Sequence, residues 1–433
     1  MRRNTFLLFL FIFFINGIVS AQKIDLFFPH FAGIEYDFFV FEGTKNDTIT
    51  SGVIDEKGHV TLILPEKYKD YRGMGRWMLK DRGGLDFIVN GTDFSISCVD
   101  AVPSEKSIIY SKDEENYFLR NQLTAQQNLL KKIEGLLLVD EAYKGQENCD
   151  LCTLIQRELI TQKSIYEKSI EEIISSSLYA SYYCRINDFY RQVPLYTIYD
   201  RTDENAKLDN QKRFVEQELN MDALYTSGLW SHVISQTFDL YPVNADFGVA
   251  MTKALERAKS QKIFEQFAED LIIICEQFDW QDANEIITSY LLNSQRIKEP
   301  KGQVAKAFSA YQIRPGAKAP EIKGVKLKNK LVIFHETGCH NCSIQLEELI
   351  KHHDDIKKKG YDVVSISADL DSSTFEKTAA KFPWKDKLCD YKGFKGGNFL
   401  NYSIYGTPTI IIVDNKGIIQ GRYARLKDTG LLD

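Results

Sequence analysis

The stretch LVIFHETGCHNC, residues 331–342, decides the fold of the C-terminal part of the chain. Its first six residues form the apolar run of a buried strand, and residues 342–359 follow the apolar spacing of a helix. Cys339 therefore follows a strand and lies in the first turn of a helix, with Cys342 three residues later. There, unpaired N–H groups and the helix dipole favour a thiolate over a thiol. The stretch predicts that Cys339 attacks disulfides and that Cys342 can close a disulfide with it.

The residues that follow continue this alternation of strands and helices. The expected elements are a strand at 362–369, a helix at about 372–381, a strand at 409–414 and a strand at 418–424. Asn415, Lys416 and Gly417 form the turn of a terminal hairpin. The pattern predicts an α/β domain over residues 315–433.

A C-x-x-C pair also occurs in zinc sites, where a second cysteine pair or a spaced histidine pair follows. After Cys342 the only later cysteine is Cys389. His352 and His353 are adjacent on a predicted helix and cannot act together on one face. We therefore expect neither a metal nor another cofactor.

Three segments together carry a resemblance to a known family. They are GAKAP (316–320), the stretch at 331–342 and TPTIIIVDNKGIIQGR (407–422). This part, about a quarter of the chain, resembles the thioredoxin superfamily, specifically its exported TlpA/ResA-like thiol–disulfide oxidoreductases. The resemblance implies that Cys339 and Cys342 form a redox-active disulfide. It also implies that Pro408 is a cis-proline facing the sulfurs, and that Thr407 and Pro408 form a substrate groove.

The sequence departs from this family at three positions near the pair. Gly338 stands where thioredoxin-type proteins commonly carry Trp, Ile333 where thioredoxins have a buried acid, and Gln345 where ResA-like proteins have Glu. Proton handling at Cys342 must therefore differ from that of the relatives.

Four residues close to the pair are candidates for tuning it: His335, Glu336, His340 and Asn341. As an imidazolium, His340 would stabilise the Cys339 thiolate and make the centre more oxidising. The alternative for His340 is an exposed spacer, and for Glu336 a surface acid at a strand end.

Upstream, the periodicity predicts two further domains. Residues 22–103 alternate like strands and predict an antiparallel β-sandwich. Residues 104–295 have the three- and four-residue spacing of packed helices, and 296–314 are the expected linker. The β-rich module, with DEKGHVTL at 55–62, followed by helices and a TlpA-like domain, resembles the DUF4369-like arrangement of exported bacterial proteins.

The first residues of the chain have the pattern of a targeting signal. Arg2 and Arg3 precede an apolar run at 6–19, and small residues stand at Val19-Ser20-Ala21. This pattern predicts a cleaved signal peptide over 1–21, with an N-terminal membrane anchor as the alternative. We therefore expect a periplasmic protein.

The remaining cysteines have several possible roles. Cys149 and Cys152 form a second C-x-x-C, for which we expect a structural disulfide or free thiols, with a redox role as the minor alternative. Cys389 is expected in a loop, either as a buried thiol or as an acceptor of electrons from the main pair. Three others lie in apolar patterns and are expected in the core: Cys98, Cys184 and Cys275.

Composition narrows the classes of partner. The 433 residues carry a formal net charge of -6 without a basic run, which argues against nucleic acid. The expected partners are protein or small-molecule thiols and disulfides, and a membrane or periplasmic electron donor.

Two other functions compete with that of an oxidoreductase. A thiol peroxidase would need Pro and Thr where Val332 and Glu336 stand, and a binding protein would use the fold as a scaffold. The chain ends nine residues after Ala424, so we expect the closing helix of the domain to be a stub or truncated.

Overall fold

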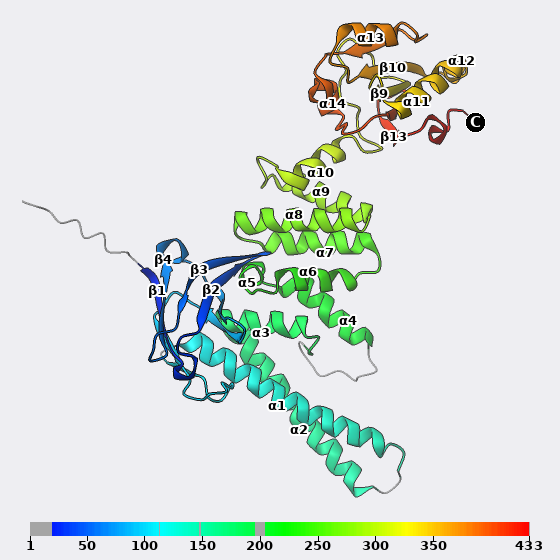
Figure 1. Cartoon of the computed structure of the whole chain (residues 1–433). Coiled ribbons are helices and arrows are strands. Elements are labelled where there is room, and N and C mark those ends of the chain that lie inside the picture. Colours follow the sequence, from blue (N-terminus) through cyan, green and yellow to red (C-terminus); the bar gives the residue numbers. More distant parts are fainter. Residues whose placement is uncertain (1–19, 112, 147–148, 195–203, 433) are drawn as a thin grey trace, which may run out of the picture. The chain divides into compact units, whose positions relative to one another are not determined.

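The computed structural model describes residues 20–111, 113–146, 149–194 and 204–432. The predicted signal peptide lies outside the described residues except for its last two, which begin strand β1 (Ser20–Phe27). The chain divides into two compact units (Figure 1). One comprises Met1–Pro242 with Lys253–Phe264, and the other comprises Val243–Thr252 with Glu265–Asp433.

The first unit contains two four-stranded sheets, in the orders β4-β1-β7-β8 and β3-β2-β5-β6. The further strands are β2 (Glu35–Glu42), β3 (Lys45–Val53), β4 (His59–Pro65), β5 (Gly73–Leu79), β6 (Gly83–Val89), β7 (Phe94–Ser97) and β8 (Ile109–Ser111). Buried side chains of both sheets, among them Leu62, Phe38 and Trp77, share one core. The predicted sandwich is confirmed. It is antiparallel except for β1 and β7, which run parallel.

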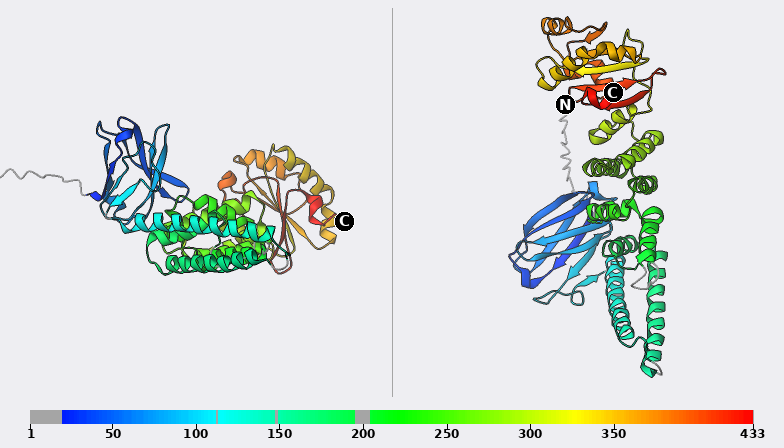
Figure 2. Two further views of the ribbon diagram at one scale, coloured as in Figure 1. Left: turned by 90° about the horizontal axis from the view of Figure 1, so that it is seen from below. Right: turned by 90° about the vertical axis from the view of Figure 1, so that its right-hand side faces the viewer.

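Helices follow the sheets in the same unit. They are α1 (Glu114–Ala142), α2 (Asp150–Ser175), α3 (Tyr179–Tyr190), α4 (Glu204–Arg213), a π-helical segment (Phe214–Glu218), α5 (Met221–Tyr225) and α6 (Trp230–Asp239). Helices α1 and α2 lie side by side as a long hairpin (Figures 1 and 2). The carbonyls of Tyr225 and Thr226 accept the N–H groups of Gly43 and Met74 at 2.7 and 2.8 Å. The strands and the helices up to α6 therefore belong to one compact unit.

The second unit carries the sheet that contains the 331–342 stretch. Its strands are β9 (Lys330–His335), β10 (Asp362–Ser367), β11 (Asp386–Cys389), β12 (Thr409–Val413) and β13 (Ile419–Tyr423). Their order is β11-β10-β9-β12-β13. Strands β9, β10 and β11 are parallel, whereas β12 is antiparallel to β9 and β13 to β12. This is the predicted α/β domain.

Helices accompany this sheet, and apolar cores cover both of its faces. The helices are α11 (His340–Lys351), α12 (His353–Lys358), α13 (Ser372–Ala379), α14 (Gly397–Asn401) and the 3-10 segment η5 (Leu426–Thr429). Leu349 of α11 and Leu426 of η5 are buried in the core of one face. Phe399 of α14 and Phe334 of β9 are buried in the core of the other. The chain after β13 thus packs on the sheet.

The structure corrects three details of the sequence analysis. The expected linker contains a helix, α10 (Gly302–Gln312), because Val304, Ala307 and Phe308 form a buried apolar stripe. Cys389 ends β11 instead of lying in a loop. That short strand has no apolar run to predict it. The helix expected at 342–359 is broken at His352 into α11 and α12.

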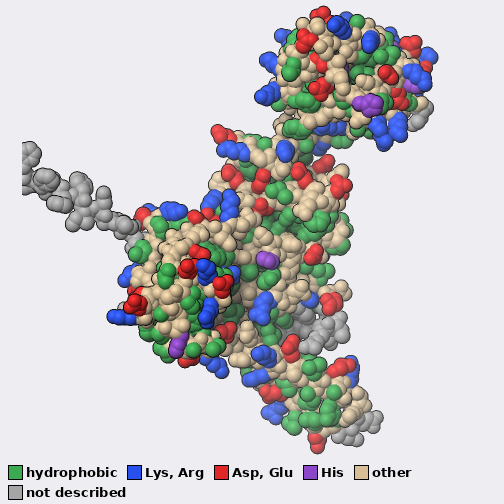
Figure 3. Space-filling view, viewed as in Figure 1, with side chains coloured by type: hydrophobic (Ala, Val, Ile, Leu, Met, Phe, Trp, Pro, Cys, Tyr) green, Lys and Arg blue, Asp and Glu red, His purple; other side chains and the backbone are tan. Residues whose placement is uncertain are grey.

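Three more helices precede α10 in the chain. They are α7 (Asn244–Arg257), α8 (Gln261–Gln277) and α9 (Gln281–Ser294). None of the helices in the described part of the chain is both long and apolar enough to span a bilayer. Acidic and basic side chains are intermingled over the visible face of each part (Figure 3).

Candidate active site

Cys339 occupies the N-cap position of α11, directly after the loop that follows β9. Its side chain is half-exposed and its backbone is extended, with φ -73° and ψ 117°. The preceding residue, Gly338, has φ 86°, a left-handed conformation in which a side chain would be strained. The backbone turn into α11 thus explains why Gly338 replaces the expected tryptophan.

Cys342 lies one turn into α11 and has no exposed surface. Its N–H donates to the Cys339 sulfur at 3.3 Å. Burial raises the pKa of the Cys342 thiol to about 11, and the Cys339 side chain adds to this effect, whereas a hydrogen bond with the Thr407 side chain opposes it. Cys342 is therefore protonated at neutral pH, and of the two cysteines Cys339 is the one that is partly exposed to solvent.

The loop before β12 places Thr407 against the cysteine pair. The Cys339 thiol donates to the Thr407 carbonyl oxygen at 3.8 Å. The peptide bond between Thr407 and Pro408 is cis, and both residues are half-exposed. The Thr409 hydroxyl donates to the Gly406 carbonyl at 2.8 Å and so fixes the loop. The structure thus brings Cys339, Cys342 and Thr407 together.

The predicted tuning residues occupy different environments. His340, Asn341 and Glu336 are exposed, and the Glu336 carbonyl accepts the Cys339 N–H at 3.4 Å. His335 has no exposed surface, and burial lowers its pKa to about 4, so it is neutral at physiological pH. Neither of its ring nitrogens has a hydrogen-bond partner among the described residues.

In the described part of the chain, the cysteine pair has no bonded acid–base side chain. Among the described residues, no carboxylate or imidazole group hydrogen-bonds to either sulfur of Cys339 or Cys342. A proton that leaves Cys342 must therefore pass to water or to a group that the substrate brings.

Asp369 supports the loop before Cys339, a role that was not predicted from the sequence. It is buried just after β10, and its two carboxylate oxygens accept the N–H and the hydroxyl of Thr337 at 2.9 and 2.7 Å. Thr337 also contacts the Thr378 hydroxyl at 3.1 Å. One feature could have indicated the contact between Thr337 and Asp369. Both residues follow strands, β9 and β10, that are parallel neighbours, so the residues after these strands meet at one edge of the sheet.

Gln345, which replaces the glutamate of ResA-like proteins, has a structural role. It is buried on α11, and its amide oxygen accepts the N–H of Leu426 at 2.6 Å, across 81 positions of sequence. An ionised Glu would be costly to bury there, whereas the neutral amide satisfies the backbone donor.

The other cysteines lie elsewhere in the fold. Cys149 and Cys152 form a disulfide. Cys98, Cys184 and Cys275 are buried, as predicted, at 2%, 0% and 1% exposure. The Cys389 thiol is half-exposed, donates to the Asp369 carbonyl at 3.2 Å and has a pKa raised by burial.

The part of the chain that the structure describes contains no group of three or more His, Cys, Asp or Glu residues that could hold a metal ion.

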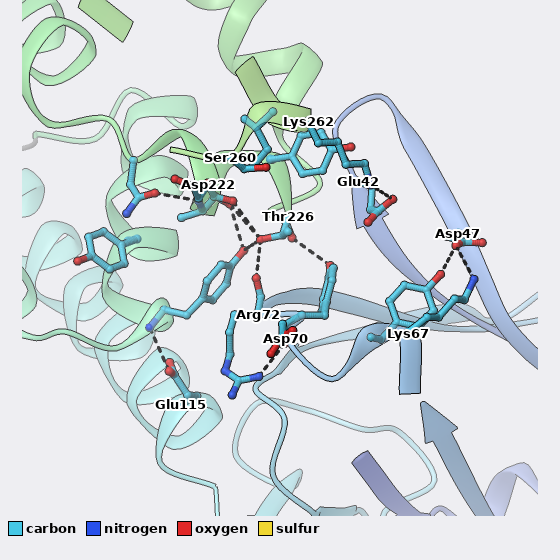
Figure 4. A pocket seen from close by; sticks show the side chains of 18 of the residues that line it. Glu42, Asp47, Lys67, Asp70, Arg72, Glu115, Asp222, Thr226, Ser260 and Lys262 are labelled. Carbon is cyan, nitrogen blue, oxygen red and sulfur yellow. Dashed lines mark hydrogen bonds and ion pairs between the residues drawn. The ribbon is translucent and has the colours of Figure 1, made fainter. Parts of the chain in front are cut away.

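A cavity of about 800 Å³ lies in the first unit (Figure 4). Its walls are rich in Tyr and in charged groups, and many of them pair with one another. Lys262 bonds Glu42 at 2.8 Å, and the Thr226 hydroxyl bonds the Arg72 carbonyl at 2.7 Å. No cysteine lines this cavity, so it is separate from the thiol site.

A C-x-x-C pair at the start of a helix, after the central strand of a five-stranded sheet, defines a thioredoxin-fold domain. The sequence profile of the thioredoxin-like family matches residues 328–419. The chain is thus a multidomain protein whose C-terminal domain belongs to the thioredoxin superfamily.

Solved structures from Bacteroides species are similar to parts of the chain. The thioredoxin domain of a thiol-disulfide oxidoreductase from Bacteroides vulgatus is 28% identical over 27% of this chain and 91% of its own, with a TM-score of 0.24. A thiol:disulfide interchange protein from Bacteroides sp. is 28% identical over 27% and 86%, also at 0.24. A thioredoxin-like protein from Bacteroides caccae is 16% identical over 59% and 92%, at 0.29. No curated protein matches the chain.

Proposed function

We propose that the chain is an exported, TlpA/ResA-like thiol–disulfide oxidoreductase that exchanges electrons with protein thiols through Cys339 and Cys342. One observation carries the proposal. A half-exposed cysteine caps α11, and the buried Cys342 lies one turn behind it with its N–H on the Cys339 sulfur. This arrangement suits one sulfur that attacks and a second that resolves.

The exchange takes two balanced steps. The Cys339 thiolate attacks a substrate disulfide, so that one S–S bond forms as another breaks and one substrate thiolate leaves. Cys342 then gives its proton to that thiolate and attacks the Cys339 sulfur, which breaks the mixed disulfide and releases the second substrate sulfur as a thiolate. That thiolate takes up from water the proton that Cys339 had lost. The products are the Cys339–Cys342 disulfide and a substrate dithiol. Two electrons have moved from enzyme to substrate, and every step is reversible.

Thr407 and Pro408 form the substrate groove in this proposal. Both are half-exposed beside Cys339, and the Thr407 carbonyl already contacts the attacking thiol. A periplasmic location rests on the sequence of residues 1–21. There, a membrane or periplasmic dithiol would return the enzyme to its reduced form, a role assigned by the chemistry of the cycle.

The test is to trap the intermediate. In a Cys342→Ser variant the second step cannot occur, so a mixed disulfide between Cys339 and a protein substrate should accumulate. Cys389→Ser, which removes a half-exposed thiol of the same domain, is the matched control and should trap nothing. If Cys342→Ser forms no mixed disulfide with a reducible protein disulfide in excess, the proposal is wrong.

A further inference from the structure

The disulfide between Cys149 and Cys152 lies at the start of α2, at the end of the α1–α2 hairpin. We propose that it is a second thiol–disulfide exchange centre, reduced by the dithiol of a partner protein. The main site does not use these cysteines, and three features of the hairpin distinguish this disulfide from a structural crosslink.

The first feature is a match in local geometry with the pair at Cys339. Cys149 is the N-cap of α2, with φ -94° and ψ 100°, and Cys152 lies three residues on. The Cys152 N–H donates to the Cys149 sulfur at 3.1 Å, as the Cys342 N–H does to Cys339 at 3.3 Å. Both pairs thus place a sulfur among the free N–H groups of a helix start, which stabilises a departing thiolate.

The second feature is that the disulfide holds no two elements together. Its cysteines are three positions apart on one helix, and so short a loop gains little from a crosslink. The hairpin has other supports. Ile133 of α1 is buried with Ile155 and Leu159 of α2. Gln156 donates to Asp140 across the hairpin at 2.6 Å.

The third feature is access. Both cysteines are half-exposed, whereas Cys342 of the main pair is fully buried. Leu151, between them, is 44% exposed, and Leu154 is 62% exposed. Hydrophobic side chains are visible at this end of the hairpin (Figure 3). A partner thiol can therefore approach the sulfurs without opening the fold.

The reaction balances with a protein dithiol as the reductant. A partner thiolate attacks one sulfur of the disulfide, which forms a mixed disulfide and releases the other hairpin sulfur as a thiolate. The partner's second thiol then attacks the partner's first sulfur, which breaks the mixed disulfide and releases the remaining hairpin sulfur as a thiolate. Both hairpin thiolates take up the protons that the partner's two thiols have lost. Cys149 and Cys152 end as thiols, the partner ends as a disulfide, and two electrons have entered the hairpin.

The test uses the full chain with Cys339→Ala and Cys342→Ala, so that its outcome is independent of the function proposed for that pair. The remaining free thiols are blocked with an alkylating agent under native conditions. The protein is then mixed with reduced thioredoxin or with glutathione at equal thiol concentration. Newly released hairpin thiols are counted by mass after a second alkylation.

We expect thioredoxin to reduce Cys149–Cys152 at least about tenfold faster than glutathione, because a dithiol completes the exchange within one complex. The helical circular dichroism should not change. A disulfide that resists thioredoxin, or that is reduced only as helix is lost, would overturn the proposal.

A second variant tests the structural alternative directly. Cys149→Ser with Cys152→Ser should shift the thermal midpoint by less than about 4 °C, since the disulfide joins no separate elements. A larger fall would identify it as a structural crosslink and overturn the proposal.

Discussion

The thiol of Cys339 lies 3.8 Å from the carbonyl oxygen of Thr407, 68 positions further along the chain. The two meet because β9, which leads to Cys339, pairs with β12, which follows Thr407. Cys342 lies behind them without exposed surface. The fold therefore leaves the sulfur of Cys339 half-exposed and buries that of Cys342.

Alkylation should distinguish the two sulfurs. In reduced protein at pH 8, iodoacetamide should modify Cys339 and leave Cys342 intact. With a pKa of about 11, Cys342 is a thiolate in about one molecule in a thousand at that pH, and it is also buried. Labelling of Cys342 should rise only as the pH approaches 11. Peptide mass spectrometry measures the labelling of each cysteine. Equal labelling of Cys339 and Cys342 at pH 8 would contradict the assignment of Cys339 as the reactive sulfur.

The Thr407 side chain should tune Cys342. Its hydrogen bond lowers the Cys342 pKa, so Thr407→Val should raise that pKa further and slow the resolving step several-fold. The ultraviolet absorbance of the thiolate gives the titration. Tyr405→Phe is a control in the same loop, because this side chain is 67% exposed and its change leaves the bond between Thr409 and Gly406 intact. A Cys342 pKa that stays constant or falls in Thr407→Val would exclude this role.

Strand and helix periodicity was sufficient to predict the β-sandwich, the helices and the α/β domain, because burial on one face leaves a repeating apolar pattern. The site depended instead on side chains that meet across the sheet. Asp369 and Thr337 are neighbours only because β9 and β10 pair in parallel. The partner of Gln345 is a backbone group 81 positions away, which no local pattern reveals.

Two predictions were wrong for a similar reason: the linker at 296–314 and the loop at Cys389. Charged and small residues around α10 resemble a linker, and only the buried stripe with Phe308 distinguishes it. Strand β11 carries two charged residues in four and is held by its pairing with β10. Tertiary contacts, not propensity, make both segments regular.

His335 should give the fold a specific pH dependence. Its pKa falls from 6.5 to about 4 on burial, so the fold favours the neutral ring. Below pH 6.5 the ring takes up a proton in the unfolded chain but not in the fold. The free energy of unfolding therefore has its full value above pH 6.5, falls as the pH drops below 6.5, and has lost this contribution once the pH has fallen through 4. The contribution amounts to about 3 kcal/mol. His335→Leu should remove this part of the loss, as urea unfolding of reduced protein at pH 7 and pH 4 would show. An equal loss in the variant would refute the attribution.

Gln345 should matter for stability more than for chemistry. Gln345→Ala leaves the Leu426 N–H without its acceptor and should cost about 1–3 kcal/mol in the free energy of unfolding. The rate of thiol–disulfide exchange, measured at temperatures where the variant is folded, should stay within about threefold of the wild-type rate. A large loss of rate in fully folded Gln345→Ala would instead place this residue in proton transfer. Glu347→Ala, an exposed change on the same helix, is the control.

A redox titration would show whether Cys339 and Cys342 form a reversible redox pair. The protein should carry Cys149→Ala and Cys152→Ala, so that the hairpin disulfide does not contribute to the thiol count. Across ratios of reduced to oxidised dithiothreitol, we expect a single two-electron transition, with the Cys339–Cys342 disulfide identified by peptide mass. If no disulfide forms between these two cysteines at any ratio, while the domain remains folded, they are not a redox pair and the proposed function is wrong.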